Sequence, residues 1–298
     1  MRQAILITAY KNFDHLKEII DFFDHNFRVY IHIDKKVKVP KKQLLDLKSN
    51  PIVSLVSQRY KVNWGGLNHL RAILHLSQEA LNNPTNLYFH LISGHDFPIK
   101  SLEDFVPFLN QNKDSDFLDY FSVPKKGWAD NNGMDRLEYF NLYDYLNAKN
   151  LEQNGWIRRI VRFQKWIGYK RKLSSNMPKL YAGSTWWSLS RPSLNHVVNY
   201  TKQNKILLNR FKHTLCAEEF FFQTVLLNSP FSKRIKNDNL RHIDWVARNG
   251  NNPAVLDLSD LADLKKSNAY FARKFDYPTS TALLEMVKKD ILGDERDK

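Results

Sequence analysis

Short apolar runs alternate with longer amphipathic runs through the first third of the sequence, and this alternation constrains the fold more than any other feature. QAILITAY and FRVYIHID have the length and composition of buried strands, whereas LNHLRAILHLSQEAL repeats its apolar residues with the period of a helix. The order strand, helix, strand, strand, helix, strand predicts an α/β fold with a Rossmann-like sheet. Strands are expected over 3–10, 27–34, 52–56 and 87–94, and helices over 13–24 and 67–81.

Polar residues follow two of these predicted strands. HIDKK occupies 32–36 after the second strand, and SGHDFPIK occupies 93–100 after the fourth. Ligands of open α/β sheets bind outside the carboxyl ends of the strands, so these two segments are candidate binding loops.

The charge of the chain indicates an anionic partner. Its 298 residues carry a formal net charge of +14, and 43% of them are hydrophobic, which is enough for a proper core. Nucleotides, nucleic acid and a membrane face are the partners that such a charge favours. A basic nucleic-acid-binding protein is therefore one hypothesis. The basic residues are spread along the chain and no recognised nucleic-acid module occurs, so we expect no nucleic-acid partner.

Two absences in the sequence bear on location and redox chemistry. No run reaches the roughly 18 to 20 apolar residues of a membrane span, and the first residues lack the pattern of a signal peptide. We therefore expect a cytoplasmic protein. The one cysteine, Cys216, excludes an internal disulfide and a cysteine-cluster metal site, and its neighbours favour a small buried hydrophobic residue over a nucleophile.

Residues 214–224, TLCAEEFFFQT, set two glutamates against three phenylalanines. A carboxylate beside buried aromatics loses hydration, which raises its pKa and suits it to accept a proton from a hydroxyl near pH 7. The alternative is an ordinary amphipathic helix that begins near Ala217, with Glu218 and Glu219 in the first turn, where the helix dipole favours acids. The stretch alone leaves both interpretations open.

The sequence offers no convincing metal site. Its one Asp-x-Asp pair, Asp114 and Asp116, follows a predicted helix rather than an apolar strand, so we interpret it as part of a solvated loop. The segment after the fourth strand supplies a single carboxylate, Asp96, beside His95. A diphosphate bound without metal needs basic side chains instead. Arg273 and Lys274 in FARKFD fit that need, as do Arg241 and Arg248 around the predicted strand LRHIDW.

A basic amphipathic stretch, GWIRRIVRFQKWIGYKRKL, occupies 155–173. On a helical wheel its tryptophan, phenylalanine and isoleucine residues fall on one side, and Arg158, Arg162 and Lys165 fall on the other. Such a helix can lie on an anionic membrane face as a peripheral contact, or it can be a surface helix with a buried stripe.

Seven segments together resemble the core-2/I-branching glycosyltransferases, a family of β-1,6-N-acetylglucosaminyltransferases that also contains the peptide O-xylosyltransferases. They are HIDKK, VNWGGLNHLRAILHLSQEAL, LYFHLISGHDFPIK, AGSTWWSLSR, EEFFFQTVLLNSP, LRHIDW and SNAYFARKFD, and the similarity runs from about residue 3 to about residue 285. The resemblance implies a GT-A-type fold with a mixed central sheet flanked by helices, a UDP-sugar donor, inversion at the anomeric carbon and no divalent metal or other cofactor.

The resemblance also assigns roles to individual residues. Glu219 falls on the family's catalytic base, with Glu218 in support, and Lys274 falls on a residue that contacts the UDP diphosphate. Arg248, in preference to Arg241, is expected to be the second diphosphate contact. Three groups complete the expected site: Thr8, Ala9 and Asp34 on the uridine side; Arg273 beside Lys274; and His95, Asp96, Trp186, Trp187 and Asp244 along the donor and acceptor cleft.

The expected organisation is one glycosyltransferase domain with a nucleotide-binding part at 1–110, a variable acceptor-facing or membrane-facing part at 111–180 and a catalytic, diphosphate-binding part at 181–298. Animal members are membrane-anchored and disulfide-rich. This chain has one cysteine and shows no pattern of a membrane span or signal peptide, so it resembles the soluble bacterial members instead. The expected reaction moves N-acetylglucosamine from its UDP-sugar to a glycan or lipid-linked glycan in bacterial surface polysaccharide synthesis, at the inner face of the cell membrane. Transfer of xylose, or of a hexose from another UDP-sugar, is the alternative.

Overall fold

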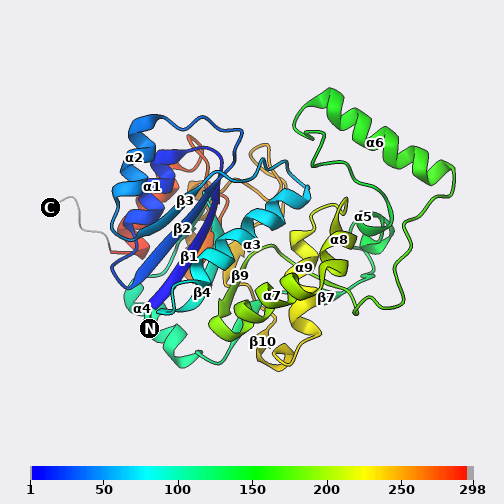
Figure 1. Ribbon diagram of the computed structural model, residues 1–298. Helices are drawn as coiled ribbons and strands as arrows, with labels where there is room; N and C mark the ends of the chain where they lie inside the picture. The colour runs from blue at the N-terminus through cyan, green and yellow to red at the C-terminus, as the bar shows by residue number, and fades with distance from the viewer. Residues whose placement is uncertain (1, 294–298) are drawn as a thin grey trace.

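The computed structural model describes residues 2–293, and its centre is a mixed sheet (Figure 1). Within these residues the sheet has seven strands in the order β10-β6-β9-β4-β1-β2-β3. β9 runs antiparallel to β4 and β6, whereas β1 is parallel to its neighbours β2 and β4. The sheet strands are β1 (Arg2–Ala9), β2 (Phe27–Ile33), β3 (Val53–Ser57), β4 (Asn86–Ser93), β6 (Asp116–Leu118), β9 (Trp187–Ser190) and β10 (Ile235–Lys236).

Helices cover both faces of this sheet, and each face has its own apolar core. Alternate residues of β1 divide between the two cores, with Leu6 in one and Ile5 and Ile7 in the other. One core is covered by α3 (Leu67–Leu81), α7 (Arg191–Gln203), α8 (Lys205–Phe211) and α9 (Glu218–Leu227). The other is covered by α1 (Phe13–Asp21), α2 (Lys41–Ser49), α4 (Leu102–Gln111), α10 (Leu261–Lys266) and α11 (Thr281–Met286). The predicted mixed α/β fold is confirmed.

A small second sheet adjoins the carboxyl end of β4. It consists of β11 (Arg241–Ile243), β12 (Phe271–Arg273) and β5 (Asp96–Pro98), and β12 is antiparallel to β5. This pairing brings the last third of the chain to the edge of the main sheet at which the sequence predicted binding loops.

The segment between β6 and β9 lies beside this body and contains the projecting helix α6 (Leu151–Trp166), the green helix in Figure 1. It also contains α5 (Asp135–Glu138) and the short pair β7 (Phe121–Ser122) and β8 (Tyr181–Ala182). Single-turn elements complete the structure: η1 (Asp130–Gly133), η2 (Ser232–Arg234), η3 (Leu258–Asp260) and η4 (Val287–Ile291). No helix in the described part of the chain is both long enough and apolar enough to cross a membrane.

The predicted elements of the first third are confirmed, and the misses have physical causes. α2 was not predicted, because only Leu47 of that helix is buried and its sequence carries little periodicity. β12 was not predicted, because a three-residue strand is too short to show alternation.

The solvated-loop prediction for the Asp-x-Asp pair is wrong for Asp116. This residue begins β6, is fully buried and accepts hydrogen bonds from the Ser190 backbone N–H (2.6 Å) and the Ser193 hydroxyl (2.5 Å). Burial raises the pKa of Asp116. Only Asp114 is solvated, and the two carboxylates therefore do not form a pair that faces a common ligand.

Candidate active site

The pairing of β5 with β12 sets a buried carboxylate against a buried arginine. Asp96 lies opposite Arg273 in the register, and Arg273 Nε is 3.7 Å from Asp96 Oδ1. The other oxygen, Oδ2, accepts two hydrogen bonds of 2.5 Å from the backbone N–H and the hydroxyl of Ser93, at the end of β4. Asp96 is fully buried and Arg273 is nearly so. Two charges can be buried together here because each neutralises the other.

Lys274 follows this pair and has a different environment. No carboxylate of residues 2–293 lies within 4.0 Å of its ammonium group. The neighbouring Arg273 guanidinium is stacked 3.9 Å from the centroid of the Trp186 ring. Burial and the charge of Arg273 lower the pKa of Lys274 to about 8. A half-buried cation without a paired carboxylate is suited to hold an anionic ligand.

Further positive charge gathers around Tyr10, immediately after β1. The Tyr10 ring lies 5.1 Å from the ring of His95, and the ammonium groups of Lys11 and Lys149 lie 5.8 Å and 4.3 Å from its centroid. Both lysines contribute to the lowered pKa of Lys274. Lys11 is paired with Asp276 (2.5 Å), so Lys149 adds more net positive charge to this region. Burial lowers the pKa of His95 to about 4, so its ring is neutral at pH 7.

A hydrogen-bonded histidine connects the end of β1 to the start of α9. His69 Nδ1 lies 3.0 Å from Glu218 Oε1, and His69 Nε2 lies 3.4 Å from the Thr8 hydroxyl oxygen. A carboxylate only accepts, so Nδ1–H donates to Glu218, and Nε2 is left to face the Thr8 hydroxyl. Glu218 is 5% exposed, which agrees with the predicted supporting role rather than with direct contact to a substrate.

Glu219 differs from the rest of its helix. α9 is buried nearly all round, and only Glu219 and Leu227 of its residues are not buried. The Glu219 side chain keeps 27% of its surface exposed, and its Oε2 lies 2.5 Å from Arg136 NH1. Burial raises the pKa of Glu219 to about 7, with Arg136 acting in the opposite direction. Glu219 therefore lies in the first helix turn, as the amphipathic-helix interpretation predicted. Its raised pKa is the one that the general-base interpretation predicted.

Residues 183–186 connect this acid to the buried charge pair. The backbone N–H of Gly183 donates to the carbonyl oxygen of Glu219 (2.9 Å), and three residues later Trp186 lies against Arg273. On the opposite side, β1 and β4 pair Thr8 with Ser93. The contacts thus form a closed ring around one region at the strand ends.

Asp119 and Gln223 fix the position of this connecting segment. The Asp119 carboxylate accepts a hydrogen bond from Ser184 N–H (2.9 Å), and the Gln223 amide donates to the Ser184 carbonyl oxygen (2.7 Å). Only glycine fits at position 183, because a Cβ atom there would lie 2.0 Å from the backbone oxygen of Asp119.

The predicted uridine-side residues lie together at the ends of β1 and β2. The backbone N–H of Asp34 donates to the carbonyl oxygen of Ala9 (2.9 Å). The Asp34 carboxylate accepts hydrogen bonds of 3.1 Å from the backbone N–H groups of Lys36 and Val62. Asp34 therefore orders the loop that contains Lys36 and the loop that contains Val62, beside Thr8. A uridine contact here stays a prediction.

Trp187 does not line the cleft as predicted. It is fully buried in the core, and its ring lies 5.0 Å from that of Phe222. Successive residues of an extended strand face opposite sides, so Trp186 and Trp187 cannot both face one cleft. Trp186 is the one that reaches Arg273.

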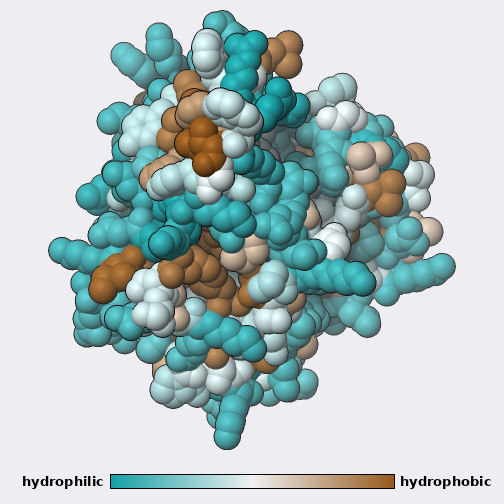
Figure 2. Space-filling view, turned by 90° about the vertical axis from the view of Figure 1, so that its right-hand side faces the viewer, coloured by the Kyte–Doolittle hydropathy of each residue, from teal (hydrophilic) through white to brown (hydrophobic). Residues whose placement is uncertain are grey.

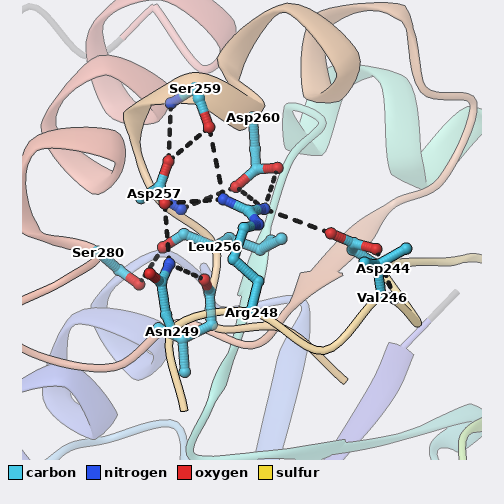
Figure 3. A network of polar contacts seen from close by, with 10 residues as sticks. Asp244, Val246, Arg248, Asn249, Leu256, Asp257, Ser259, Asp260 and Ser280 are labelled. Atoms are coloured by element: carbon cyan, nitrogen blue, oxygen red, sulfur yellow. Dashed lines mark hydrogen bonds and ion pairs between the residues drawn. The ribbon is translucent and has the colours of Figure 1, made fainter. Parts of the chain in front are cut away.

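The structure gives Arg248 partners other than the predicted diphosphate (Figure 3). Arg248 Nη2 lies 2.6 Å from Asp260 Oδ1 and 3.3 Å from Asp244 Oδ2. Arg248 Nη1 lies 2.7 Å from Asp257 Oδ2. These carboxylates raise the pKa of Arg248 still further. Asp244, predicted to line the cleft, instead belongs to this cluster.

The loop that Arg248 stabilises holds the backbone of Lys274. The Lys274 N–H donates to Ala254 O (3.2 Å), and Leu256 N–H donates to Lys274 O (2.8 Å). The Arg248 cluster therefore positions the predicted diphosphate-binding lysine. Arg241, the rejected alternative, is buried and donates to the carbonyl oxygens of Leu91 and Trp187.

No group of three or more histidine, cysteine, aspartate or glutamate side chains within residues 2–293 is arranged to hold a metal ion. Metal independence stays a prediction.

The site thus combines a partly exposed carboxylate, Glu219, with positively charged side chains at the strand ends. The model of the Core-2/I-branching enzyme family matches residues 4–266. The chain therefore belongs to the Core-2/I-branching enzyme family, a family of glycosyltransferases, and the predicted resemblance and GT-A-type fold class are confirmed.

Similar proteins include two xylosyltransferases. Xylosyltransferase oxt of Drosophila pseudoobscura pseudoobscura is 26% identical over 285 residues, and xylosyltransferase 2 of Rattus norvegicus is 27% identical over 285 residues. Each match covers 89% of this chain, which spans only 30% of the length of either relative. Among solved structures, TarS of S. aureus is 14% identical, with a TM-score of 0.37 over 79% of this chain and 57% of that chain, a likeness that supports no inference.

Sequence reasoning missed two residues of the site. His69 lies in the segment WGGLNH, where no local pattern marks the histidine as a site residue. Arg136 comes from the variable middle third, where no pattern marks one arginine among many. Only the fold brings it to Glu219.

The two shifted pKa values predict a bell-shaped pH dependence of kcat/KM for the donor. Glu219 must be deprotonated to accept a proton, so the rate is expected to rise as the pH increases through about 7. Lys274 must be protonated to hold an anion, so the rate is expected to fall as the pH increases through about 8. Steady-state rates across this pH range measure both limbs.

Two variants assign these limbs. Arg136→Gln removes a charge that lowers the pKa of Glu219 and should move the acidic limb alone to higher pH. Lys274→Arg should remove the alkaline limb, since a guanidinium does not titrate in this range. Unchanged limbs in these variants would contradict the assignments.

The Arg248 cluster predicts a stability effect. Arg248→Met leaves three carboxylates without their cation and should lower the free energy of unfolding by about 1–3 kcal/mol, measured by denaturant unfolding without nucleotide. Asp260→Asn distinguishes the alternatives, because it should also destabilise the fold if Arg248 is structural. Tighter UDP binding by Asp260→Asn at unchanged stability would instead restore Arg248 as a diphosphate contact.

Proposed function

We propose that this chain is an inverting glycosyltransferase that moves a sugar from a UDP-sugar to a hydroxyl group of a glycan. The observation that carries the proposal is Glu219, the one carboxylate of a buried helix that remains partly exposed, with its pKa raised to about 7. Across the same ring of contacts lie Arg273 and Lys274, which supply positive charge for a diphosphate.

The proposed reaction is a single displacement. Glu219 accepts the proton of the acceptor hydroxyl while the hydroxyl oxygen forms a bond to C1 of the sugar. The bond from C1 to the phosphate oxygen breaks on the opposite face. UDP leaves with the bonding electron pair, and Lys274 neutralises the charge that develops on it. Arg136 holds Glu219 in place and keeps a fraction of it ionised near neutral pH. His69 and Glu218 position the start of α9 relative to β1.

We propose UDP-xylose and UDP-N-acetylglucosamine as the two donors to compare. The curated relatives named above are xylosyltransferases, which favours xylose. The resemblance to β-1,6-N-acetylglucosaminyltransferases in the sequence analysis favours N-acetylglucosamine. A hexose other than these remains the third option.

For the acceptor and its location we propose a glycan of bacterial surface polysaccharide, free or lipid-linked, at the inner, cytoplasmic face of the cell membrane. The support is the basic and aromatic composition of 155–173 together with the net charge of +14. No metal or other cofactor takes part in the proposed reaction.

Calorimetric titration of UDP in the presence of EDTA tests the donor site. Binding in the micromolar range is expected, because the positive charges around Lys274 replace a metal ion. The same preparation, given UDP-xylose and UDP-N-acetylglucosamine, should hydrolyse one of them slowly. Activity that disappears with chelator and returns with manganese would contradict metal-independent transfer.

Glu219→Gln separates binding from chemistry. The amide cannot accept the proton, so the transfer rate should fall by about 10² to 10⁴-fold while UDP affinity and the unfolding midpoint stay unchanged. Glu218→Gln neutralises the adjacent acid of the same helix turn but can still accept the hydrogen bond from His69, so it should lose less activity than Glu219→Gln. Full transfer activity of Glu219→Gln would exclude this residue as the base.

A further inference from the structure

One helix leaves a row of large aromatic side chains uncovered by the rest of the chain. Only Ile157 and Gln164 of α6 are buried. Trp156 is 49% exposed, Phe163 56% and Trp166 81%. The predicted stripe therefore divides in the structure, because Ile157 faces the protein while the aromatic residues face away from it.

The exposed residues form two stripes. Trp156, Phe163 and Ile167 recur at the spacing of one helix face, and Ile167 is 53% exposed. Arg158 and Arg162 are exposed one turn apart on the other side of the helix, and Arg159 lies 5.1 Å from the centroid of the Trp156 ring. Neither Arg158 nor Arg162 has a carboxylate within 4.0 Å among residues 2–293. Large apolar side chains beside unpaired cations are the composition of a helix that lies in a membrane interface.

The buried side chain of Ile157 and several polar contacts attach α6 to the body. The Gln164 side chain accepts from Phe140 N–H (2.8 Å) and donates to Phe140 O (3.2 Å), and Lys165 forms an ion pair with Asp135. The helix needs no aromatic residue for these contacts. Its position beyond the sheet and its helices is plain in Figure 1, and Figure 2 shows that side of the molecule as largely hydrophilic with separate apolar patches.

We infer that the exposed face of α6, defined by Trp156, Phe163, Trp166 and Ile167 with Arg158 and Arg162, is a docking surface for an anionic lipid bilayer. Charge complementarity favours this occupant, since the chain carries +14 and the arginines of this face are unpaired. Aromatic rings at the headgroup level and arginines toward lipid phosphates account for both stripes.

The same attachment links the docking surface to the proposed base. Asp135 pairs with Lys165 of α6, and the next residue, Arg136, pairs with Glu219. Segment 135–140 therefore contacts both α6 and the site. A bilayer bound to α6 would lie on the side of the molecule from which this segment approaches Glu219. The inference extends the proposed function by naming the surface that presents a lipid-linked acceptor, and its test does not depend on catalysis.

Vesicle sedimentation of the full chain tests the inference. Phosphatidylcholine vesicles are compared with vesicles that also contain phosphatidylglycerol, and only the latter should bind wild type. Replacing Trp156, Phe163 and Trp166 with serine should weaken binding at least tenfold, because interfacial binding scales with buried apolar area. Arg158→Gln with Arg162→Gln should weaken it by about fivefold per arginine and reduce its salt dependence.

The control variant combines Lys205→Gln with Ile206→Ser on α8, where Ile206 is 75% exposed, and it should bind like wild type. UDP affinity, measured on every variant, should be unchanged, which separates loss of docking from loss of folding. Wild type that ignores anionic vesicles, or an aromatic variant that binds them fully, would overturn the inference. Self-association that the serine replacements abolish would overturn it in favour of a second copy. Vesicle binding by a chain that binds no UDP would leave the docking surface standing and contradict the proposed function.

Discussion

The buried pair of Asp96 and Arg273 is the interaction on which the site depends. It joins a strand that continues directly from the first half of the main sheet to a strand from the last third of the chain. A lone buried charge at either position would cost several kcal/mol, so the two strands are held in this register. The register in turn places Lys274 beside the pair and the Arg273 guanidinium over Trp186. The donor region is therefore a consequence of how the two sheets meet.

The sequence predicted the parts of this arrangement that depend on local pattern. Strand ends at Thr8, Asp34 and Asp96, and the helix start at Glu219, follow from periodicity and from a family resemblance carried by contiguous motifs. It failed where side-chain direction or a distant partner decides the outcome. Trp187 is an example, since the facing of adjacent tryptophans depends on strand parity and on which face the core occupies.

The two arginines near LRHIDW show the same limit for charge. A sequence lists cations but not the anions that already neutralise them, and Arg248 is held by Asp244, Asp257 and Asp260. A signal was present, because DLSD places two of these acids shortly after the arginine. Lys274 is the opposite case. It has no paired carboxylate within residues 2–293, and this leaves its charge available for an anionic ligand.

Segment 135–140 explains why the variable third matters to a site built elsewhere. Arg136 lowers the pKa of Glu219, against a burial that raises it to about 7, so the protonation of the base depends on a residue outside the main sheet. The same segment carries α6 through Asp135 and the Phe140 backbone. Lys149, two residues before α6, also contributes to the lowered pKa of Lys274. The middle third therefore bears on both the proposed base and the proposed anion-binding region.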